Sequence, residues 1–245
     1  MTLTKTLLGV IPLMMLLGCS NPADKVPGAS VGPAASSAKT GRETSNEPGQ
    51  YFAFGPESAA IEFIGSKVTG SHRGGFRNFA GEFRVVNGLL ADSGNKIVID
   101  TASLWADNNR VMGHLKTPDF FDVAKYPTAT FMSTSIKQTQ NGSTVTGNLS
   151  LHGITKEISF PATIQIAPDG VNVTAEFFLN RFDFEIKYPG KPDDLIRKEV
   201  VLKLNIKAVP GRAAFASIEQ AAQTTIASTQ ATPGWGGAQR SSANH

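Results

Sequence analysis

The chain has 245 residues, of which 18% are charged and 40% hydrophobic, with a formal net charge of +3, four histidines and one cysteine. A single cysteine excludes an internal disulfide framework and CxxC-type metal or haem sites, and so few histidines argue against a metal centre. The small net charge, without a Lys/Arg cluster interleaved with aromatics, argues against nucleic-acid binding. We expect no cofactor, and the length suits one domain of about 150–200 residues with extensions.

Residues 1–18 have the organisation of an export signal. Lys5 supplies the positive n-region, and residues 7–17 form an apolar segment too short to span a bilayer. The following Leu-Leu-Gly-Cys, residues 16–19, resembles a bacterial lipobox, which implies that Cys19 is acylated and becomes the mature N-terminus. The alternative is an ordinary secreted protein with an incidental cysteine. We expect a lipoprotein anchored to a membrane of the bacterial cell envelope, on the periplasmic side, with Ser20 favouring the outer membrane.

Residues 19–50 are rich in Pro, Gly, Ala and Ser and show no hydrophobic periodicity. This composition predicts a disordered tether. At about 5–6 Å × √n, its reach is on the order of 30 Å.

Residues 51–209 consist of short runs in which apolar and polar residues alternate, which predicts strands of an all-β domain. Asn-Gly and Asp-Gly pairs between the runs, such as Asn87-Gly88 and Asp169-Gly170, favour tight hairpins and therefore antiparallel neighbours. The predicted strands are residues 61–69, 79–86, 96–104, 128–138, 144–151, 158–166, 171–179 and 200–206.

One long connection, residues 107–127, interrupts the predicted strands. Asp107 can cap a short helix that runs through Leu115 or Lys116 and ends before Pro118. The final segment, residues 210–245, is a low-complexity tail with helical potential over residues 212–227 and an isolated Trp235.

Eight antiparallel strands favour a closed barrel, because closure removes the exposed sheet edges. A barrel of this size is either filled by side chains or holds one small ligand. Its inward positions mix large with small apolar residues, which allows both a solid core and an elongated cavity. The large residues include Phe63, Phe83, Phe131, Phe160 and Phe177, and the small ones Gly81, Ala129, Gly147, Ala162 and Ala175.

Three ordered motifs resemble the YceI-like family. Residues 114–131 (HLKTPDFFDVAKYPTATF) are similar to its hallmark HL…FFDV.KYP..TF, and residues 145–156 (VTGNLSLHGITK) to its VTG.LT motif. Residues 180–184 (NRFDF) resemble a third element, from which the chain departs by having Glu185 where a glycine is usual. The resemblance spans about residues 52–208.

This resemblance implies an all-β, eight-stranded antiparallel lipocalin-like barrel with one short helix or lid insertion. It also implies a long-chain apolar lipid as ligand, such as a polyisoprenoid, an isoprenoid quinone or a fatty amide, carried, stored or used in stress protection without catalysis. A homodimer is compatible with it. The expected lipid tunnel is lined by Phe63, Phe83, Ile99, Phe120, Phe131, Leu149, Phe160, Ile164, Phe177 and Leu204.

Polar candidates are weighed against plainer roles. His114 with Asp119 and Asp122 suggests a catalytic or metal cluster, but we favour a lid with Phe120 and Phe121 packed inward and the carboxylates capping backbone N–H groups. The alternatives to lipid binding are therefore a lipid-modifying enzyme that uses His114, and a filled barrel that binds a partner protein.

The remaining polar residues are assigned to the surface or to a barrel end. His72 and His152 are interpreted as surface-turn histidines, and residues 70–75 as a loop, with contact between Arg73 and a ligand head group as the alternative role of that loop. Arg181 and Asp183 are expected to pair with each other or with backbone at a barrel end; the alternative is that they place a polar group at the tunnel mouth. Residues 187–198 are interpreted as an exposed charged loop.

Overall fold

The computed structural model describes residues 21–36 and 48–230. The export signal and Cys19 lie outside the described residues, as do residues 37–47 and Trp235. The strands are β1 Ser30–Pro33, β2 Gln50–Phe54, β3 Ala59–Lys67, β4 Gly70–Phe76, β5 Phe79–Val86, β6 Leu89–Leu90, β7 Lys96–Asp100, β8 Leu104–Ala106, β9 Thr128–Thr139, β10 Gly142–Leu151, β11 Ile154–Ala167, β12 Gly170–Asn180, β13 Gly190–Lys191 and β14 Asp194–Pro210. The helices are α1 Asn109–Leu115 and α2 Phe215–Gln230, with short 3-10 helices η1 Pro22–Lys25, η3 Thr101–Ser103 and η4 Arg181–Phe184.

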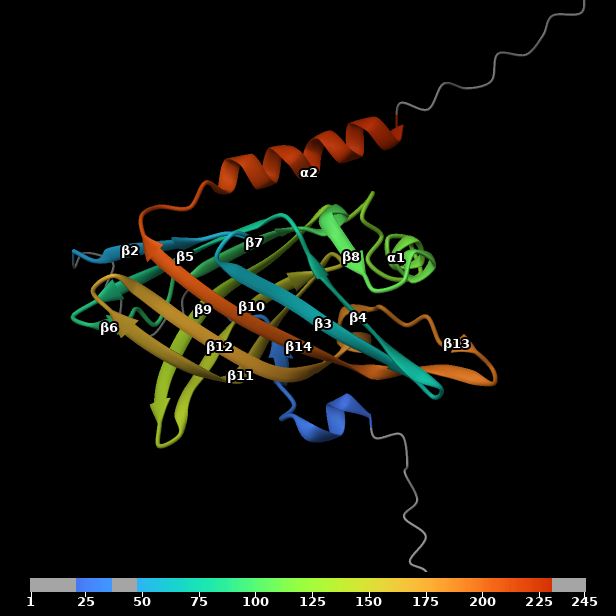
Figure 1. The fold of residues 1–245 in the computed structure, drawn as a ribbon, viewed down its shortest axis with the longest axis horizontal. Helices are drawn as coiled ribbons and strands as arrows, with labels where there is room; N and C mark the ends of the chain where they lie inside the picture. The colour runs from blue at the N-terminus through green and yellow to red at the C-terminus, as the bar shows by residue number, and fades with distance from the viewer. Residues whose placement is uncertain (1–20, 37–47, 231–245) are drawn as a thin grey trace, which may run out of the picture.

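Eight antiparallel strands close into a barrel, which confirms the predicted fold class, but one member of the ring is β2, which was not predicted, in place of the predicted strand 61–69, which is β3. The ring runs β11-β10-β9-β7-β5-β2-β14-β12 and returns to β11. Figure 1 shows these long strands crossing in two layers around one interior. From Val171 onward burial alternates along β12, where Val171, Val173, Ala175, Phe177 and Leu179 face inward.

The longest strand, β14, changes partners along its length. Its last residues, Val209 and Pro210, pair with β2, whereas residues 196–206 pair with β3. β3 continues through β4 to β8, so the wall at this end of the barrel is built from β14, β3, β4 and β8. α1 contacts β8 and lies beside it at this end of the barrel (Figure 1).

Two predicted strand boundaries were wrong. Residues 70–75 are not a loop, because they form most of β4. Gly74 lies within this strand and lets the ring of Phe63 come close to the backbone, since a Cβ there would lie 2.4 Å from that ring. Residues 96–104 do not form one strand, because the Asp100 side chain accepts a hydrogen bond from the N–H of Ala102 and starts η3 between β7 and β8.

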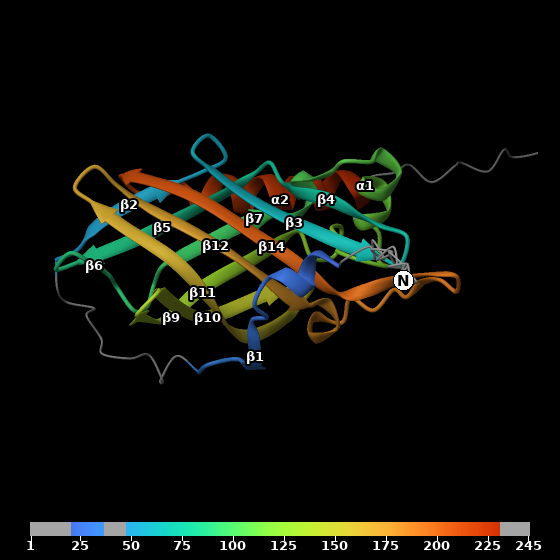
Figure 2. The same cartoon turned by 60° about the horizontal axis from the view of Figure 1, so that its bottom comes forward.

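The predicted disordered tether is also wrong over residues 21–36, which are built into the barrel wall. The register of β11 on β12, if continued, would place Ser159 opposite Phe178. Instead Ser159 pairs with Ser30, and the backbone of Phe178 bridges to Gly28. The N-terminal segment therefore fills a seam between β11 and β12, antiparallel to the first strand and parallel to the second (Figure 2).

Side-chain contacts hold this segment at both ends. The carboxamide of Asn148 accepts a hydrogen bond from the N–H of Ala35 and donates one to its carbonyl, both at 2.9 Å. At the other end Asn21 caps η1, and Ala23 is buried. Backbone groups of β11 and β12 that would otherwise be unpaired in the seam are thus satisfied.

The tail beyond the barrel contains α2, which lies on the outer face of β5 and β7 (Figure 1). Ile218 packs against Ala80 and Val98 in a small second core. The buried carboxylate of Glu82 pairs with the guanidinium of Arg212, accepts a hydrogen bond from the N–H of Ala213 and so fixes the start of this segment. Within residues 21–36 and 48–230, neither helix is long and apolar enough to cross a membrane.

The predicted short helix is α1, and it ends at Leu115 as expected. Its N-cap is Asn108 and not Asp107: the Asn108 Oδ1 accepts from the N–H groups of Arg110 and Val111. Asp107 instead accepts a hydrogen bond from the N–H of Arg73 and so joins the helix to β4.

A lidded apolar cavity as the candidate functional site

A cavity of about 740 Å³ lies inside the barrel. The structure therefore resolves the choice left open by the mixture of large and small inward residues, because the barrel is not filled. Every one of the ten residues expected to form the tunnel lines this cavity: Phe63, Phe83, Ile99, Phe120, Phe131, Leu149, Phe160, Ile164, Phe177 and Leu204. Whether they contact a lipid stays a prediction.

One end of the cavity is closed by aromatic side chains of β2. Phe52 and Phe54 are almost completely buried but do not line the cavity. The ring of Phe54 lies 4.9 Å from that of Phe83 and covers Gly81, the residue directly opposite in the register. A glycine is required here, because a Cβ would come within 1.9 Å of the Phe54 ring.

The middle of the cavity is walled by phenylalanines that pack on small residues. Phe160 stacks on Phe177 with ring centroids 4.2 Å apart, and Phe131 leans against Phe160 at 5.8 Å. Phe131 covers Gly147, where a Cβ would lie 2.5 Å from the ring. Some small residues are thus used for packing, and the remaining space stays open as the cavity.

The other end of the cavity carries the lid formed by α1 and the turn after it. Phe120 is buried, and Phe121 packs against Phe63 and Phe76 with centroid distances of 6.1 and 5.8 Å. Both rings line the cavity. The expected inward packing of the two phenylalanines is therefore what the structure shows.

The carboxylates of the lid do not act as expected. His114 Nε2 donates to Asp119 Oδ2 at 2.7 Å, so Asp119 pairs with the histidine and does not cap a backbone N–H. Asp122 adopts a positive φ of 44°, and its backbone carbonyl accepts hydrogen bonds from Lys125 and Tyr126. Among the described residues no group of three or more His, Cys, Asp or Glu side chains could hold a metal ion.

His114 is part of an aromatic cluster at the mouth of the cavity. Its ring lies edge-on to Phe120 at 5.0 Å and to Tyr188 at 4.8 Å. Tyr188 comes from the segment after η4, so this cluster ties the lid to the opposite rim. Residues 187–198 are therefore more than an exposed charged loop, and Tyr188, Lys191, Asp194 and Ile196 line the cavity. The signal in the sequence for this role was the presence of two large, partly or wholly apolar side chains, Tyr188 and Ile196, within a charged segment.

Arg181 organises this rim. Its guanidinium is buried and donates to the carbonyls of Ile186 at 2.6 Å, Tyr188 at 2.7 Å, Arg197 at 3.0 Å and Ile196 at 3.2 Å. Burial lowers the pKa of Arg181 from its usual value. The expected backbone pairing at a barrel end is what the structure shows, and Arg181 also lines the cavity.

The two other histidines that the structure describes differ in position. His152 lies in the β10–β11 turn with φ of 53°, packs on Tyr126 and donates from Nδ1 to the carbonyl of Phe184 at 3.0 Å. His72 is not in a turn: it lies on β4, lines the cavity and pairs with Asp107 at 2.8 Å. The hydrogen bond from the Arg73 N–H holds the pKa of Asp107 below its usual value, and His72 adds to this shift.

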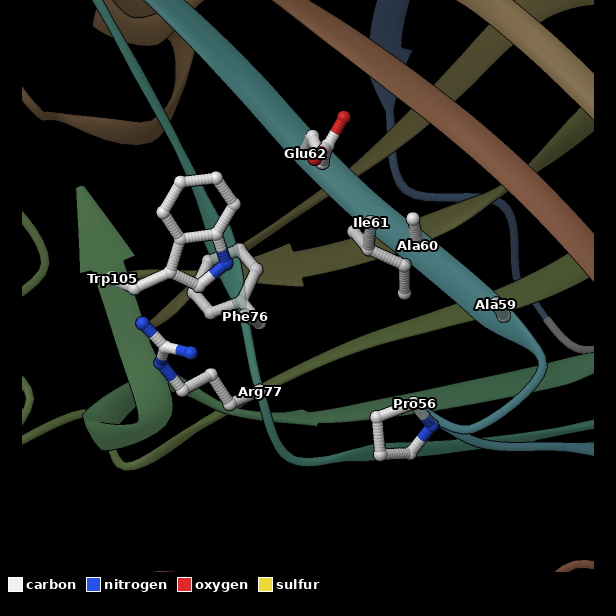
Figure 3. A pocket seen from close by; sticks show the side chains of 8 residues that line it. All are labelled: Pro56, Ala59, Ala60, Ile61, Glu62, Phe76, Arg77 and Trp105. Atoms are coloured by element: carbon white, nitrogen blue, oxygen red, sulfur yellow. The ribbon is translucent and has the colours of Figure 1, made fainter. Parts of the chain in front are cut away.

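Arg73 does not face the ligand space. Its guanidinium pairs with Glu62 on the outside of β3, and this contact raises the pKa of Arg73. A second, open hollow lies nearby outside the wall formed by β3, β4 and β8 (Figure 3). There the Arg77 guanidinium lies over the Trp105 ring, 5.8 Å from its centroid. Ile61 and Phe76 line both spaces and so separate the hollow from the cavity.

A closed antiparallel barrel with an internal apolar cavity, sealed at one end and lidded at the other, defines the class of lipocalin-like barrels. The family model for the YceI-like domain matches residues 52–208, and the chain belongs to this family. The match confirms the resemblance of the three sequence motifs.

Curated relatives include a UPF0312 protein of Pseudomonas putida strain W619, which is 38% identical over 126 residues. The alignment covers 48% of this chain and 65% of that relative. A UPF0312 protein of Vibrio parahaemolyticus is 41% identical over 91 residues, 37% of this chain and 48% of the relative.

Solved structures share the fold. BcnA of Burkholderia cenocepacia superposes with a TM-score of 0.56 at 22% identity, covering 62% of this chain and 96% of that one. A domain from Saccharophagus degradans described as a polyisoprenoid-binding domain implicated in plant cell wall breakdown gives 0.52 at 15% identity, covering 67% of this chain and all of that one. At these identities the likeness is one of fold.

Proposed function

We propose that this protein binds one long-chain apolar lipid in the barrel cavity, as a carrier, storage or stress-protection protein and not as an enzyme. The observation that carries the proposal is the 740 Å³ cavity, which falls within the roughly 300–1,000 Å³ typical of ligand sites and is lined mostly by Phe, Ile, Leu and Val. A polyisoprenoid, an isoprenoid quinone and a fatty amide all match this lining.

The energetics favour an extended apolar chain. Each CH₂ group removed from water contributes roughly 0.8 kcal/mol, so binding needs few polar contacts. Discrimination between chain lengths is weak for the same reason, because one methylene changes binding by only about 1–3 kcal/mol. The hydrogen-bonding groups of Tyr188, His114 and Arg181 lie at the lidded end, which supports a ligand orientation with any polar group at this mouth.

The absence of catalysis is part of the proposal. His114 is held between Phe120 and Tyr188, and its carboxylate partner Asp119 is exposed. Among the hydrogen bonds of the described residues, none joins the ring of His114 to a serine, threonine or cysteine that would act as a nucleophile, and the Thr117 hydroxyl donates to the backbone carbonyl of His114 instead.

We also propose that the protein is a lipoprotein of the cell envelope, on the strength of the lipobox-like residues 16–19. Cys19 precedes Asn21 by two residues, a span of at most about 7 Å at 3.3–3.6 Å per residue. An acyl anchor on Cys19 would therefore hold the barrel against the membrane, and not at the end of a long tether.

The test is extraction of the native ligand. The full chain is produced in a bacterium that processes lipoproteins, purified in mild detergent, extracted with organic solvent and examined by mass spectrometry. We expect a long-chain lipid in stoichiometric amount, much reduced in Ala129→Phe, which places a ring in the cavity. Met132→Phe is the matched control, because Met132 is on the same strand but 40% exposed on the outside. An absence of lipid from the parent chain, or equal lipid in Ala129→Phe, would refute the proposal.

A further inference from the structure

Two hairpins project beyond the barrel at the mouth of the cavity and carry exposed apolar side chains at their ends. Val68, between β3 and β4, is 56% exposed, and Leu195, at the start of β14, is 50% exposed. The two residues are neighbours, because the N–H of Val68 donates to the carbonyl of Leu195 at 3.2 Å. We call residues 67–69 and 191–195 the mouth tip; both hairpins extend to the right in Figure 1.

The mouth tip is held in one conformation by a single carboxylate. Asp194 pairs with the ammonium group of Lys67 and accepts hydrogen bonds from the N–H of Thr69 at 3.1 Å and from its hydroxyl. Lys67, Lys191 and Asp194 also line the cavity, so the exposed apolar pair lies beside the opening. An ordered surface that exposes two branched apolar side chains has a cost in water unless a partner covers them.

The charges around the tip favour an anionic partner. Residues 187–198 contain four basic and two acidic residues. Asp194 is engaged by Lys67, and the exposed carboxylate of Asp193 is the second acidic group. Lys191 and Arg197 are exposed and have no ion-pair partner among the residues that the structure describes, so the segment keeps a net positive charge. Exposed apolar residues between unpaired basic residues are the composition of interfacial membrane-binding elements.

The start of the described chain points to the same partner. η1 packs against β14, the strand that begins with the mouth tip, and Figure 2 shows it on the outside of the wall of β12 and β14. The proposed acylation site, Cys19, precedes Asn21 by only two residues. An anchor there would keep this side of the barrel beside a bilayer.

We propose that the mouth tip docks on a membrane. Val68 and Leu195 enter the interface of a bilayer that contains anionic lipid, Lys191 and Arg197 contact its head groups, and the cavity mouth faces the source of the lipid ligand. The role in lipid uptake rests on the proposed function, whereas docking itself does not.

Docking is tested by tryptophan quenching. The full chain is reconstituted in vesicles of phosphatidylethanolamine and phosphatidylglycerol that contain brominated phosphatidylcholine. Three variants are compared with the parent chain, and the emission of the parent's own tryptophans is subtracted as background. Val68→Trp and Leu195→Trp should add emission that brominated acyl chains quench, since interfacial elements insert by roughly 5–10 Å. Leu89→Trp is the matched control: Leu89 is 57% exposed but lies on β6, at the opposite end of the barrel (Figure 1).

Quenching at the mouth tip alone supports docking. Equal quenching at all three sites, or none at the tip, overturns it. A tip tryptophan that becomes shielded without vesicles, together with a doubled particle mass in detergent, would assign the surface to a second copy of the chain and also overturn membrane docking.

Uptake is tested with a fluorescent polyisoprenoid in the same vesicles. Val68→Ser combined with Leu195→Ser should slow its transfer into the protein by about tenfold or more, because burying each side chain contributes more than the roughly 1.4 kcal/mol that equals a factor of ten. Leu89→Ser should leave the rate unchanged. If the parent chain takes up no lipid although the tryptophans at positions 68 and 195 are quenched, the proposed function fails and docking stands. If the double variant takes up lipid at the parent rate, the role of the mouth tip in uptake fails.

Discussion

The sealed end of the cavity makes a quantitative prediction for Gly81→Ala. The backbone of Gly81 is ordinary strand, so alanine meets no conformational barrier there, but its Cβ would lie 1.9 Å from one carbon of the Phe54 ring and 2.4 and 2.5 Å from two others. Cβ contacts this short do not occur, so the ring must move. Phe54 is only 4% exposed and packs on Phe83, which leaves it little room. We expect a loss of stability of about 1–3 kcal/mol, the range for overpacking a tight core.

The assay is urea unfolding of the full chain, with the midpoint and the slope fitted separately. A loss of native stability should lower the midpoint without changing the slope. Gly65→Ala is the matched control, because Gly65 is also a strand glycine on the barrel wall and a Cβ there meets no atom within 4 Å. It should be neutral, or stabilising by up to about 1 kcal/mol through the unfolded chain.

A second-site change separates crowding from other causes. Phe54→Leu removes the ring that a Cβ at position 81 would meet, so the two changes together should cost less than the sum of the single changes. The reasoning is refuted if Gly81→Ala and Gly65→Ala have the same midpoint, or if the two changes at positions 54 and 81 are additive.

Four further predictions concern the rim, the turn after β12, the mouth tip and α2. Arg181→Met removes the hydrogen-bond donors to four backbone carbonyls. Because each hydrogen bond from a charged group contributes about 1.5–3 kcal/mol, we expect the free energy of unfolding to fall by several kcal/mol and amide exchange over residues 186–197 to become faster. Unchanged exchange would contradict the role of Arg181. Glu185 has a φ of 58°, so Glu185→Gly should raise the thermal midpoint by relieving about 1 kcal/mol of strain, whereas Glu185→Ala should not. The pairing with Lys67 lowers the pKa of Asp194 from its usual value of 3.8. The pairing therefore contributes stability above pH 3.8, and this contribution is lost as the pH falls through the lowered pKa. The NMR chemical shift of the Thr69 amide, which donates to Asp194, should titrate below pH 3.8, and a midpoint above that value would argue against the contact. Ile218→Ser exposes the small core under α2, and hydrogen exchange should show α2 losing protection while β5 and β7 keep theirs; loss of protection in all three would mean that the helix is needed for the barrel.

The barrel was predictable from the sequence because alternation is a local signal. In β12 each inward residue is apolar and, apart from Phe178, the outward neighbours are polar, so the pattern identifies both the strand and its inner face. The same reasoning failed at β4, where Gly74 and Gly75 were interpreted as a loop. Their role depends on the ring of Phe63 and the side chain of Trp105, which lie on other strands, and no local pattern contains that information.

The candidate site divides in the same way. The apolar lining follows from alternation and from the phenylalanines of the lid, so its ten residues were identified before the structure. The rim residues Tyr188 and Ile196 were not identified, because they lie in a charged segment of the sequence. This segment is held over the mouth by Arg181, which is seven or more residues away from each of them in the chain. The N-terminal segment was missed because Ser30 and its partner Ser159 are remote in the chain, and Pro and Gly residues gave the segment the composition of a linker.

The strand between β11 and β12 has a consequence for the order of events during synthesis and export. Residues 28–33 emerge early, but their partners, residues 156–159 and Phe178, are made after most of the barrel. Contacts across such separations close late, since the intervening chain must first lose its conformational freedom. The earliest part of the described chain should therefore be the last piece of wall to be set in place, and a nascent barrel would keep its β11–β12 edges open until the very end of folding.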